Sequence, residues 1–234
     1  MARYRRILLK LSGEAVAGAA GQGFSAQRAA TLASEIAQVA AAGVQLGIVI
    51  GGGNLIRGVS ARGIRRVTAD TMGMLATVMN ALALADVLEA AGAPACVLSA
   101  IEMPRIAEPH SAARALRRLQ QGRIVVFAGG TSNPYVSTDT AAALRALEIE
   151  AELLAKGTRV AGVFDKDPEQ HPDAVLFREI SFQEVLARGL GVLDAACVAM
   201  CRDHGLPIAV FNLNEPGNIM RISMGEAVGT LIHA

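Results

Sequence analysis

Short apolar runs alternate with helix-like segments along this 234-residue sequence. Each run is continuous rather than alternating with polar residues, which is typical of strands buried on both faces of a parallel sheet. We therefore expect an α/β fold, a three-layer αβα sandwich with a mainly parallel central sheet, formed by a single domain over residues 1–234. The expected strands are Arg6–Lys10, Val44–Ile50, Ala95–Ser99, Arg123–Ala128 and a fifth that opens at Glu152–Leu154.

The first helix-like segment is bounded by residues that commonly begin and end helices. Ser25 has the chemistry of an N-cap, and Gly43 that of a C-terminal stop, so a first helix is expected between them. Residues 157–182 are rich in Asp and Pro, and we expect a small hairpin there before the helices resume. The other expected helices cover Ala69–Ala91, Ser111–Gln121 and Thr138–Glu148.

Composition excludes several classes of protein. The formal net charge is +1, only 3% of residues are aromatic and there is no Trp, which disfavours a nucleic-acid surface. Three cysteines without ligand spacing fit reduced core residues of a cytoplasmic protein. The most apolar run, Met72–Ala85, falls short of the ~20 residues that span a bilayer, so a buried helix is expected there and no membrane partner.

Three expected strand ends have the composition of anion-binding turns. They are Lys10–Gly13, Gly51–Asn54 and Gly129–Asn133, and Arg57 follows the second. Glycine lets backbone N–H groups approach a phosphate, and a following helix adds its positive end. Steric demands of strand-to-helix turns explain the glycines equally well. No P-loop motif is present, and Ile56 stands where a dinucleotide fingerprint needs Gly, although Asp70 keeps the spacing of a ribose-binding acid.

Six longer strings extend these turns into a family pattern. They resemble bacterial-type uridylate kinases, a branch of the amino acid kinase superfamily, in the family order and over nearly the whole chain. The strings are K-L-S-G-E-A, V-I-G-G-G-N-L-I-R-G, D-T-M-G-M-L-A-T-V-M-N, T-S-N-P-Y-V-S-T-D-T-A-A, G-V-F-D-K-D-P and P-I-A-V-F-N-L-N-E-P-G-N. The third and fourth are the most specific to uridylate kinases.

The resemblance implies an enzyme that passes the γ-phosphoryl group of ATP to UMP in pyrimidine nucleotide biosynthesis. The implied catalytic residues are Lys10, Arg57 and Asp139, the last orienting the cationic groups. The implied ATP-binding residues are Lys10, Leu11, Ser12, Gly13, Gly53, Arg57, Thr158, Phe164 and Asp167. The implied UMP-binding residues are Gly52, Asp70, Thr131, Ser132, Asn133, Pro134, Tyr135, Val136, Ser137 and Thr138.

Structural explanations compete with some of these roles. Lys10 is equally typical of a solvated strand end, and Asp70 and Asp139 of helix N-caps. Asp194 also lies in a matched block, where an N-cap explains it as well as a function does. Lys166 stands where many relatives have a small residue, and either adds a cation near the phosphates or points into water.

The resemblance also implies a cofactor, an inhibitor, an assembly and a response to GTP. Mg²⁺ bridging the ATP phosphates is the expected cofactor, without a metal site made of protein ligands. UTP is an expected inhibitor and a homohexamer the expected assembly. The Gly18–Gly23 stretch lacks the polar groups of the loop that GTP-activated relatives carry, so GTP activation is expected to be weak or absent.

Two other functions stay open from the sequence. One is a sister kinase that acts on a carboxylate or carbamate, against which Asp70 and the T-S-N-P-Y segment speak. The other is a non-catalytic anion-storing protein, which the presence of Lys10, Arg57 and Asp139 together disfavours.

Overall fold

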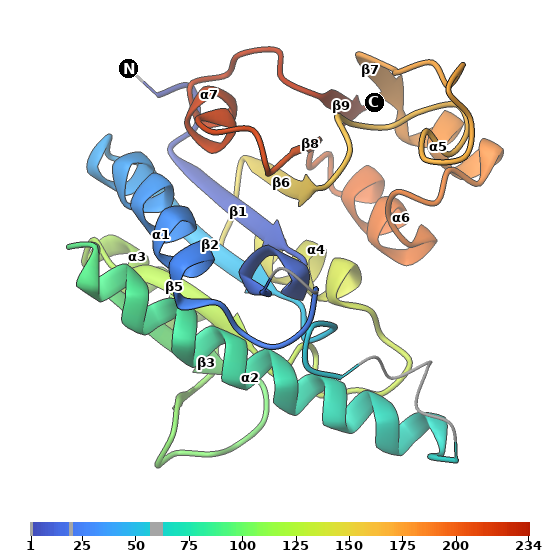
Figure 1. Cartoon of the computed structure of the whole chain (residues 1–234). Coiled ribbons are helices and arrows are strands. Elements are labelled where there is room, and N and C mark those ends of the chain that lie inside the picture. Colours follow the sequence, from blue (N-terminus) through green and yellow to red (C-terminus); the bar gives the residue numbers. More distant parts are fainter. Residues whose placement is uncertain (1, 19–20, 57–62) are drawn as a thin grey trace.

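All nine strands of the computed structural model, which describes residues 2–18, 21–56 and 63–234, belong to one sheet (Figure 1). The order across the sheet is β4-β3-β5-β2-β1-β6-β8-β9-β7. Neighbouring strands are parallel except β8 and β9, which are antiparallel. The strands are β1 (Arg6–Leu11), β2 (Gln45–Ile50), β3 (Ala95–Ser99), β4 (Glu108–Pro109), β5 (Ile124–Ala128), β6 (Leu153–Thr158), β7 (Glu179–Ser181), β8 (Ile208–Asn212) and β9 (Thr230–His233).

Helices cover both faces of this sheet. On one face lie α1, α2 and α7, and on the other α3, α4, α5 and α6. A short 3-10 helix, η1 (Gly13–Val16), follows β1. The helices are α1 (Ala26–Ala41), α2 (Arg66–Ala90), α3 (Ala112–Gln120), α4 (Thr138–Glu148), α5 (Phe182–Arg188), α6 (Ala195–Asp203) and α7 (Asn218–Ser223). The predicted αβα sandwich with a mainly parallel sheet is confirmed.

The sheet separates two apolar cores because successive side chains of a strand point to opposite faces. In β1, Ile7 and Leu9 pack under α1 and α2, whereas Leu8 packs under α4. All three side chains are at most 2% exposed. A central strand buried on both faces explains why its sequence is a continuous apolar run.

Local signals place the ends of α1 as expected. The Ser25 hydroxyl caps the helix by accepting a hydrogen bond from the backbone N–H of Arg28, and Gly43 follows with a φ of 88°. A left-handed φ is accessible to glycine without a steric penalty, which ends the helix there. In the 157–182 stretch, an antiparallel bridge joins Phe164 and Leu176, as the predicted hairpin requires.

Helix α2 differs from the prediction in length and burial. It starts at Arg66 and has 25 residues, so it is the one described helix long and apolar enough, by length and composition, to cross a membrane. Its inner face packs against α1 and the sheet, where it runs beside α1 in Figure 1. Its outer face leaves Leu75, Met79 and Leu82 exposed, so the expected buried helix is buried on its inner face only.

Candidate active site

The carboxyl end of β1 meets the end of β2 at very short range. A Cβ on Gly13 would lie 2.3 Å from Asn54 Oδ1 and 2.8 Å from the carbonyl oxygen of Gly51. No side chain fits at that distance, so glycine is required here for close approach rather than for flexibility. Gly53 faces open space instead, because a Cβ added there would have no neighbouring heavy atom within 4 Å. The two strand ends therefore form one continuous glycine-lined edge.

Three charged side chains form a row at this edge. Lys10 of β1 and Lys156 of β6 are register partners on adjacent parallel strands, so their side chains point to the same face. Asp139, in the first turn of α4, lies between them, with Oδ1 2.6 Å from Lys10 Nζ and Oδ2 2.6 Å from Lys156 Nζ. Lys156 also donates a hydrogen bond to the carbonyl oxygen of Val192. We refer to Lys10, Asp139 and Lys156 as the charged row.

Burial and charge act in opposite directions on the charged row. Burial works to raise the pKa of Asp139, but the ammonium groups of Lys10 and Lys156 outweigh it and hold that pKa below its usual value. Burial lowers the pKa of Lys156, and Asp139 only partly compensates. Asp139 is therefore ionised, and it pairs with the ammonium groups of Lys10 and Lys156.

Lys156 was missed by the sequence reasoning, although a signal was available. Both β1 (RILLKL) and β6 (LLAKGT) are apolar strands interrupted by one lysine. A lysine inside a buried strand needs a partner, which makes it a candidate for a functional site.

Two polar residues of α2, also missed, hold the glycine turns. Asn80 donates a hydrogen bond to the carbonyl oxygen of Gly51 at 2.7 Å, and its amide group also bonds to Asn54 Oδ1 at 2.7 Å. Thr77 Oγ1 accepts a hydrogen bond from the N–H of Gly129 at 2.9 Å. Both side chains are buried, so one helix fixes two strand ends of the candidate site.

A cavity of about 460 Å³ is lined by one member of the charged row, Lys10. It brings together residues from both groups that the sequence assigned, the ATP-binding and the UMP-binding residues. These are Lys10, Ser12, Gly13, Gly52, Gly53, Asp70, Asn133, Val136, Ser137 and Thr138. Thr131, Ser132, Pro134 and Tyr135 belong to the same loop but do not line the cavity, and the side chain of Leu11 lies in the core.

Asp70 lies at this cavity, in the second turn of α2. It is not an N-cap, because Arg65 holds that position. Its carboxylate accepts hydrogen bonds from Arg66 Nε at 2.8 Å and from the N–H of Tyr135 at 2.9 Å. Burial raises the pKa of Asp70, but these two donors outweigh it and leave that pKa below the usual value. The carboxylate thus ties the start of α2 to the 131–136 loop.

The N-terminus of α4 is capped by Ser137, not by Asp139. The Ser137 hydroxyl accepts hydrogen bonds from the N–H groups of Asp139 and Thr140 at 3.0 and 3.1 Å. The N-cap alternative for Asp139 was therefore wrong, and its carboxylate is free to join the charged row. For Asp194 the N-cap prediction is confirmed, since it accepts a hydrogen bond from the N–H of Cys197 at 2.9 Å.

The residues assigned to adenosine divide between two further cavities. Phe164 and Asp167 line one of about 480 Å³, together with residues 188–192. Thr158 lines a larger one of about 990 Å³. Lys166 lies at the smaller cavity, where its Nζ is 2.5 Å from Asp173 Oδ2 in an exposed ion pair.

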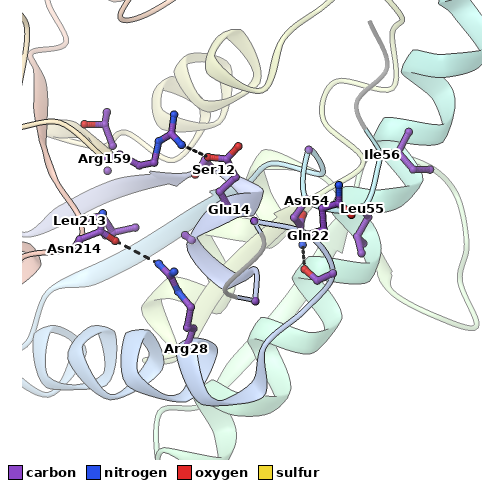
Figure 2. A pocket seen from close by; sticks show the side chains of 17 residues that line it. Ser12, Glu14, Gln22, Arg28, Asn54, Leu55, Ile56, Arg159, Leu213 and Asn214 are labelled. Atoms are coloured by element: carbon purple, nitrogen blue, oxygen red, sulfur yellow. Dashed lines mark hydrogen bonds and ion pairs between the residues drawn. The ribbon is translucent and has the colours of Figure 1, made fainter. Parts of the chain in front are cut away.

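The larger cavity shares Ser12 and Gly53 with the cavity at Lys10, and Figure 2 shows side chains that line it. Arg159 crosses it towards Glu14, with a closest N–O distance of 3.6 Å, and Arg28 Nη2 donates to Asn214 Oδ1 at 3.3 Å. The glycine-rich stretch that was compared with a GTP loop contributes Gly18, Gly21, Gln22 and Gly23. Residues 19–20 and Arg57 lie outside the described residues.

Comparison with known proteins places this arrangement in a family. The sequence pattern of the amino acid kinase family matches residues 5–212. The chain belongs to this family. Its structure is similar to that of a UMP kinase from Bacillus anthracis, with a TM-score of 0.95 and 39% identity over 98% of this chain and 96% of that one.

Two more solved structures are similar over nearly their whole length. A UMP kinase from Ureaplasma parvum has a TM-score of 0.93 and 32% identity over 99% of this chain and 100% of that one. A uridylate kinase from Archaeoglobus fulgidus has a TM-score of 0.76 and 29% identity over 97% of this chain and 99% of that one. The predicted place of this chain among the UMP kinases of the amino acid kinase family is confirmed.

Proposed function

We propose that this protein transfers the γ-phosphoryl group of ATP to UMP, giving ADP and UDP, as a step of pyrimidine nucleotide biosynthesis. The observation that carries the proposal is the charged row of Lys10, Asp139 and Lys156, in which Lys10 lines the cavity where the assigned ATP and UMP residues meet. The likeness to UMP kinases of the same length supports the choice of acceptor.

The acceptor phosphate needs positive charge rather than a base. The second pKa of a phosphate monoester is about 6, so UMP is mostly a dianion at neutral pH and already a competent nucleophile. Catalysis then consists of bringing two polyanions into line and stabilising the charge that spreads over the transferred group. Lys10 and Lys156 supply two ammonium groups on one face of the sheet. Asp139 holds both and takes no proton, because its pKa is lowered.

The glycine turns extend the proposed phosphate site. Gly13 and Gly53 line the cavity with Lys10 and are proposed to bind phosphate oxygens through their backbone N–H groups, as in the phosphate loop of the family. Arg57, which lies outside the described residues, is proposed to act on the ATP side. Thr158, Phe164 and Asp167 are proposed to line the adenosine, at the two cavities that flank the end of β6.

Mg²⁺ fits this site as an ion carried by the nucleotide. No group of three His, Cys, Asp or Glu side chains within the described ranges could hold a metal ion. Mg²⁺ is commonly bound through substrate phosphates with few protein ligands, so such a cage is not needed. When bound, it would neutralise charge on the β- and γ-phosphates of ATP.

Asp70 is proposed to bind the ribose of UMP. A carboxylate has about four lone-pair positions, and here Arg66 Nε contacts both oxygens while the N–H of Tyr135 contacts Oδ2. Asp70 lines the cavity, where about one lone-pair position is left to accept from a ribose hydroxyl group. The loop from Thr131 to Thr138 would surround the uridine and its phosphate, with Ser137 and Thr138 at the start of α4.

A coupled assay with ATP and Mg²⁺ tests the proposal against its alternatives. UMP, CMP, aspartate and acetylglutamate are offered as acceptors in parallel, and ADP release is followed. We expect turnover with UMP far above the others. Turnover with a carboxylate substrate would indicate a sister kinase. If no acceptor were phosphorylated but the protein bound phosphate tightly, a storage protein would be indicated.

Regulation, assembly and location follow from the same family argument. UTP carries the same uracil and ribose as UMP and is proposed to compete for the acceptor site. A cytoplasmic homohexamer is proposed, and the exposed Leu75, Met79 and Leu82 of α2 supply an apolar face that a second copy would cover. Light scattering of the purified protein would give six times the chain mass if this is right.

A further inference from the structure

Asp194 makes more contacts than a helix cap requires. As the N-cap of α6 it needs one oxygen to accept from the N–H of Cys197, at 2.9 Å. The same oxygen also accepts from Thr140 Oγ1 at 2.7 Å, and the other oxygen accepts from the Ser137 hydroxyl. Burial raises the pKa of Asp194, but the bonds from Ser137 and Thr140 outweigh it and keep that pKa below its usual value. The carboxylate therefore joins the starts of two helices.

The bond to Ser137 fixes the direction of its hydroxyl group. A serine hydroxyl has one proton and two lone pairs. Because the proton is donated to Asp194, the lone pairs face the N–H groups of Asp139 and Thr140, which they accept at 3.0 and 3.1 Å. Asp194 thus acts through Ser137 on the backbone of Asp139.

The segment that carries Asp194 also holds the other side of the charged row. Two residues earlier, the carbonyl oxygen of Val192 accepts a hydrogen bond from Lys156 Nζ. One short segment between α5 and α6 therefore fixes Lys156 directly and Asp139 through the start of α4. Residues 189–192 of the same segment line the cavity that contains Phe164 and Asp167.

We propose that Asp194 is a positioning residue for phosphoryl transfer, which holds Asp139 in the geometry that pairs it with Lys10 and Lys156. The proposal rests on the proposed function of the charged row. A residue that only capped α6 would need neither Ser137 nor Thr140. A misplacement of about 1 Å can cost about 100-fold in rate, so the bonds to α4 matter for turnover as well as for folding.

The test is Asp194→Ser, with Ser181→Ala as the matched control. Serine caps helices as well as aspartate, so α6 keeps its cap, but one short hydroxyl cannot accept from both Ser137 and Thr140. We expect kcat to fall about 10- to 100-fold while the KM for UMP changes less than about three-fold. Ser181 caps the neighbouring α5 by accepting from the N–H of Glu184 at 3.1 Å. Its loss should lower the melting temperature and leave kcat within about two-fold.

A double-mutant cycle separates positioning from general stability. Thr140→Val removes one donor to Asp194 at nearly constant volume, and it is combined with Asp194→Ser. If Asp194 acts through α4, the double variant should have a kcat close to that of Asp194→Ser alone. The proposal would be overturned if the kcat losses of Thr140→Val and Asp194→Ser multiplied in the double variant. A kcat of Asp194→Ser within two-fold of wild type would also overturn it.

A structural readout keeps this inference separate from the proposed function. If the wild-type protein does not phosphorylate UMP, the proposed function fails, and a crystal structure of Asp194→Ser still decides the inference. We expect Asp139 to be displaced from Lys156 in that variant and unmoved in Ser181→Ala. An intact charged row in Asp194→Ser would show that the carboxylate only caps α6.

Discussion

Replacing Asp139 by asparagine removes the negative charge between Lys10 and Lys156 at constant volume. Both ion-pair distances are 2.6 Å, and Lys10 is only 8% exposed. Breaking a buried ion pair by removing one partner costs about 3–5 kcal/mol, because the other charge stays buried without compensation. The asparagine oxygen still accepts one hydrogen bond, so we expect the lower end, a loss of about 3 kcal/mol in the free energy of unfolding at pH 7. For a chain of this size that lowers Tm by about 6–12 °C.

The loss should depend on pH in a definite direction. Burial already lowers the pKa of Lys156, and removing Asp139 lowers it further. A lysine with a folded pKa below its unfolded value destabilises the protein while it is protonated, and this penalty disappears as pH rises through that range. Asp139, with a lowered pKa, stabilises the wild type above its unfolded pKa of about 3.9 and loses this effect at lower pH. The deficit of Asp139→Asn should therefore be largest near pH 5–7 and shrink towards pH 9.

Urea unfolding followed by circular dichroism at pH 6, 7.5 and 9 measures this deficit. The control is Asp203→Asn, which removes an exposed partner of Arg202 at the end of α6 and should change stability by less than about 0.5 kcal/mol. In parallel, kcat of Asp139→Asn should fall about 10²- to 10³-fold, the scale for losing one preorganised electrostatic group. Wild-type stability in Asp139→Asn, or a deficit that does not change with pH, would refute the reasoning.

Four further predictions concern turnover, UMP binding and the two effectors UTP and GTP. Lys10→Ala should lower kcat at least about 100-fold, and near-normal turnover of a folded variant would remove Lys10 from the catalytic residues. Asp70→Asn should raise the KM for UMP about ten-fold or more with little effect on ATP, as expected for a lost charge-assisted hydrogen bond; equal effects on both substrates would make Asp70 structural. UTP should inhibit in competition with UMP. GTP should raise initial rates at subsaturating ATP by less than about three-fold, because the Gly18–Gly23 stretch has few polar groups with which GTP could bind one conformation of the enzyme more tightly than another. Strong activation would mean that GTP binds through backbone groups or elsewhere.

Local sequence signals were sufficient to predict most of the architecture. Continuous apolar runs identify β1, β2, β3 and β5 because a strand buried on both faces needs no information from distant residues. Ser25 and Gly43 mark the ends of α1 through bonds and dihedrals within a few residues. Strands β4, β7, β8 and β9 were missed. Three of them have only two to four residues, which carry no usable periodicity. Strand β8 is a continuous apolar run of five residues, so its signal was available but was not used.

The assembly of the site depended on relations that no local pattern contains. Lys156 joins Lys10 only through the register of β1 against β6, which is set by the whole sheet. Asp194 reaches Ser137 across 57 positions of sequence, and Asp70 reaches Tyr135 across 65. Family resemblance located Lys10 and Asp139 but gave no reason for Lys156 to contact Asp139 or for Asp194 to contact Ser137.

The central position of β1 has a consequence for synthesis of the chain. Leu8 pairs with Gly47 on one side and with Leu154 on the other, so its second partner follows 146 residues later. At about 5–20 residues per second, a ribosome needs about 7–30 s to supply that partner. Throughout this interval one edge of an apolar strand has unpaired backbone groups, which is the kind of edge that pairs with other chains. The yield of soluble protein should therefore respond to the translation rate between β2 and β6, even for variants that leave the stability of the finished fold unchanged.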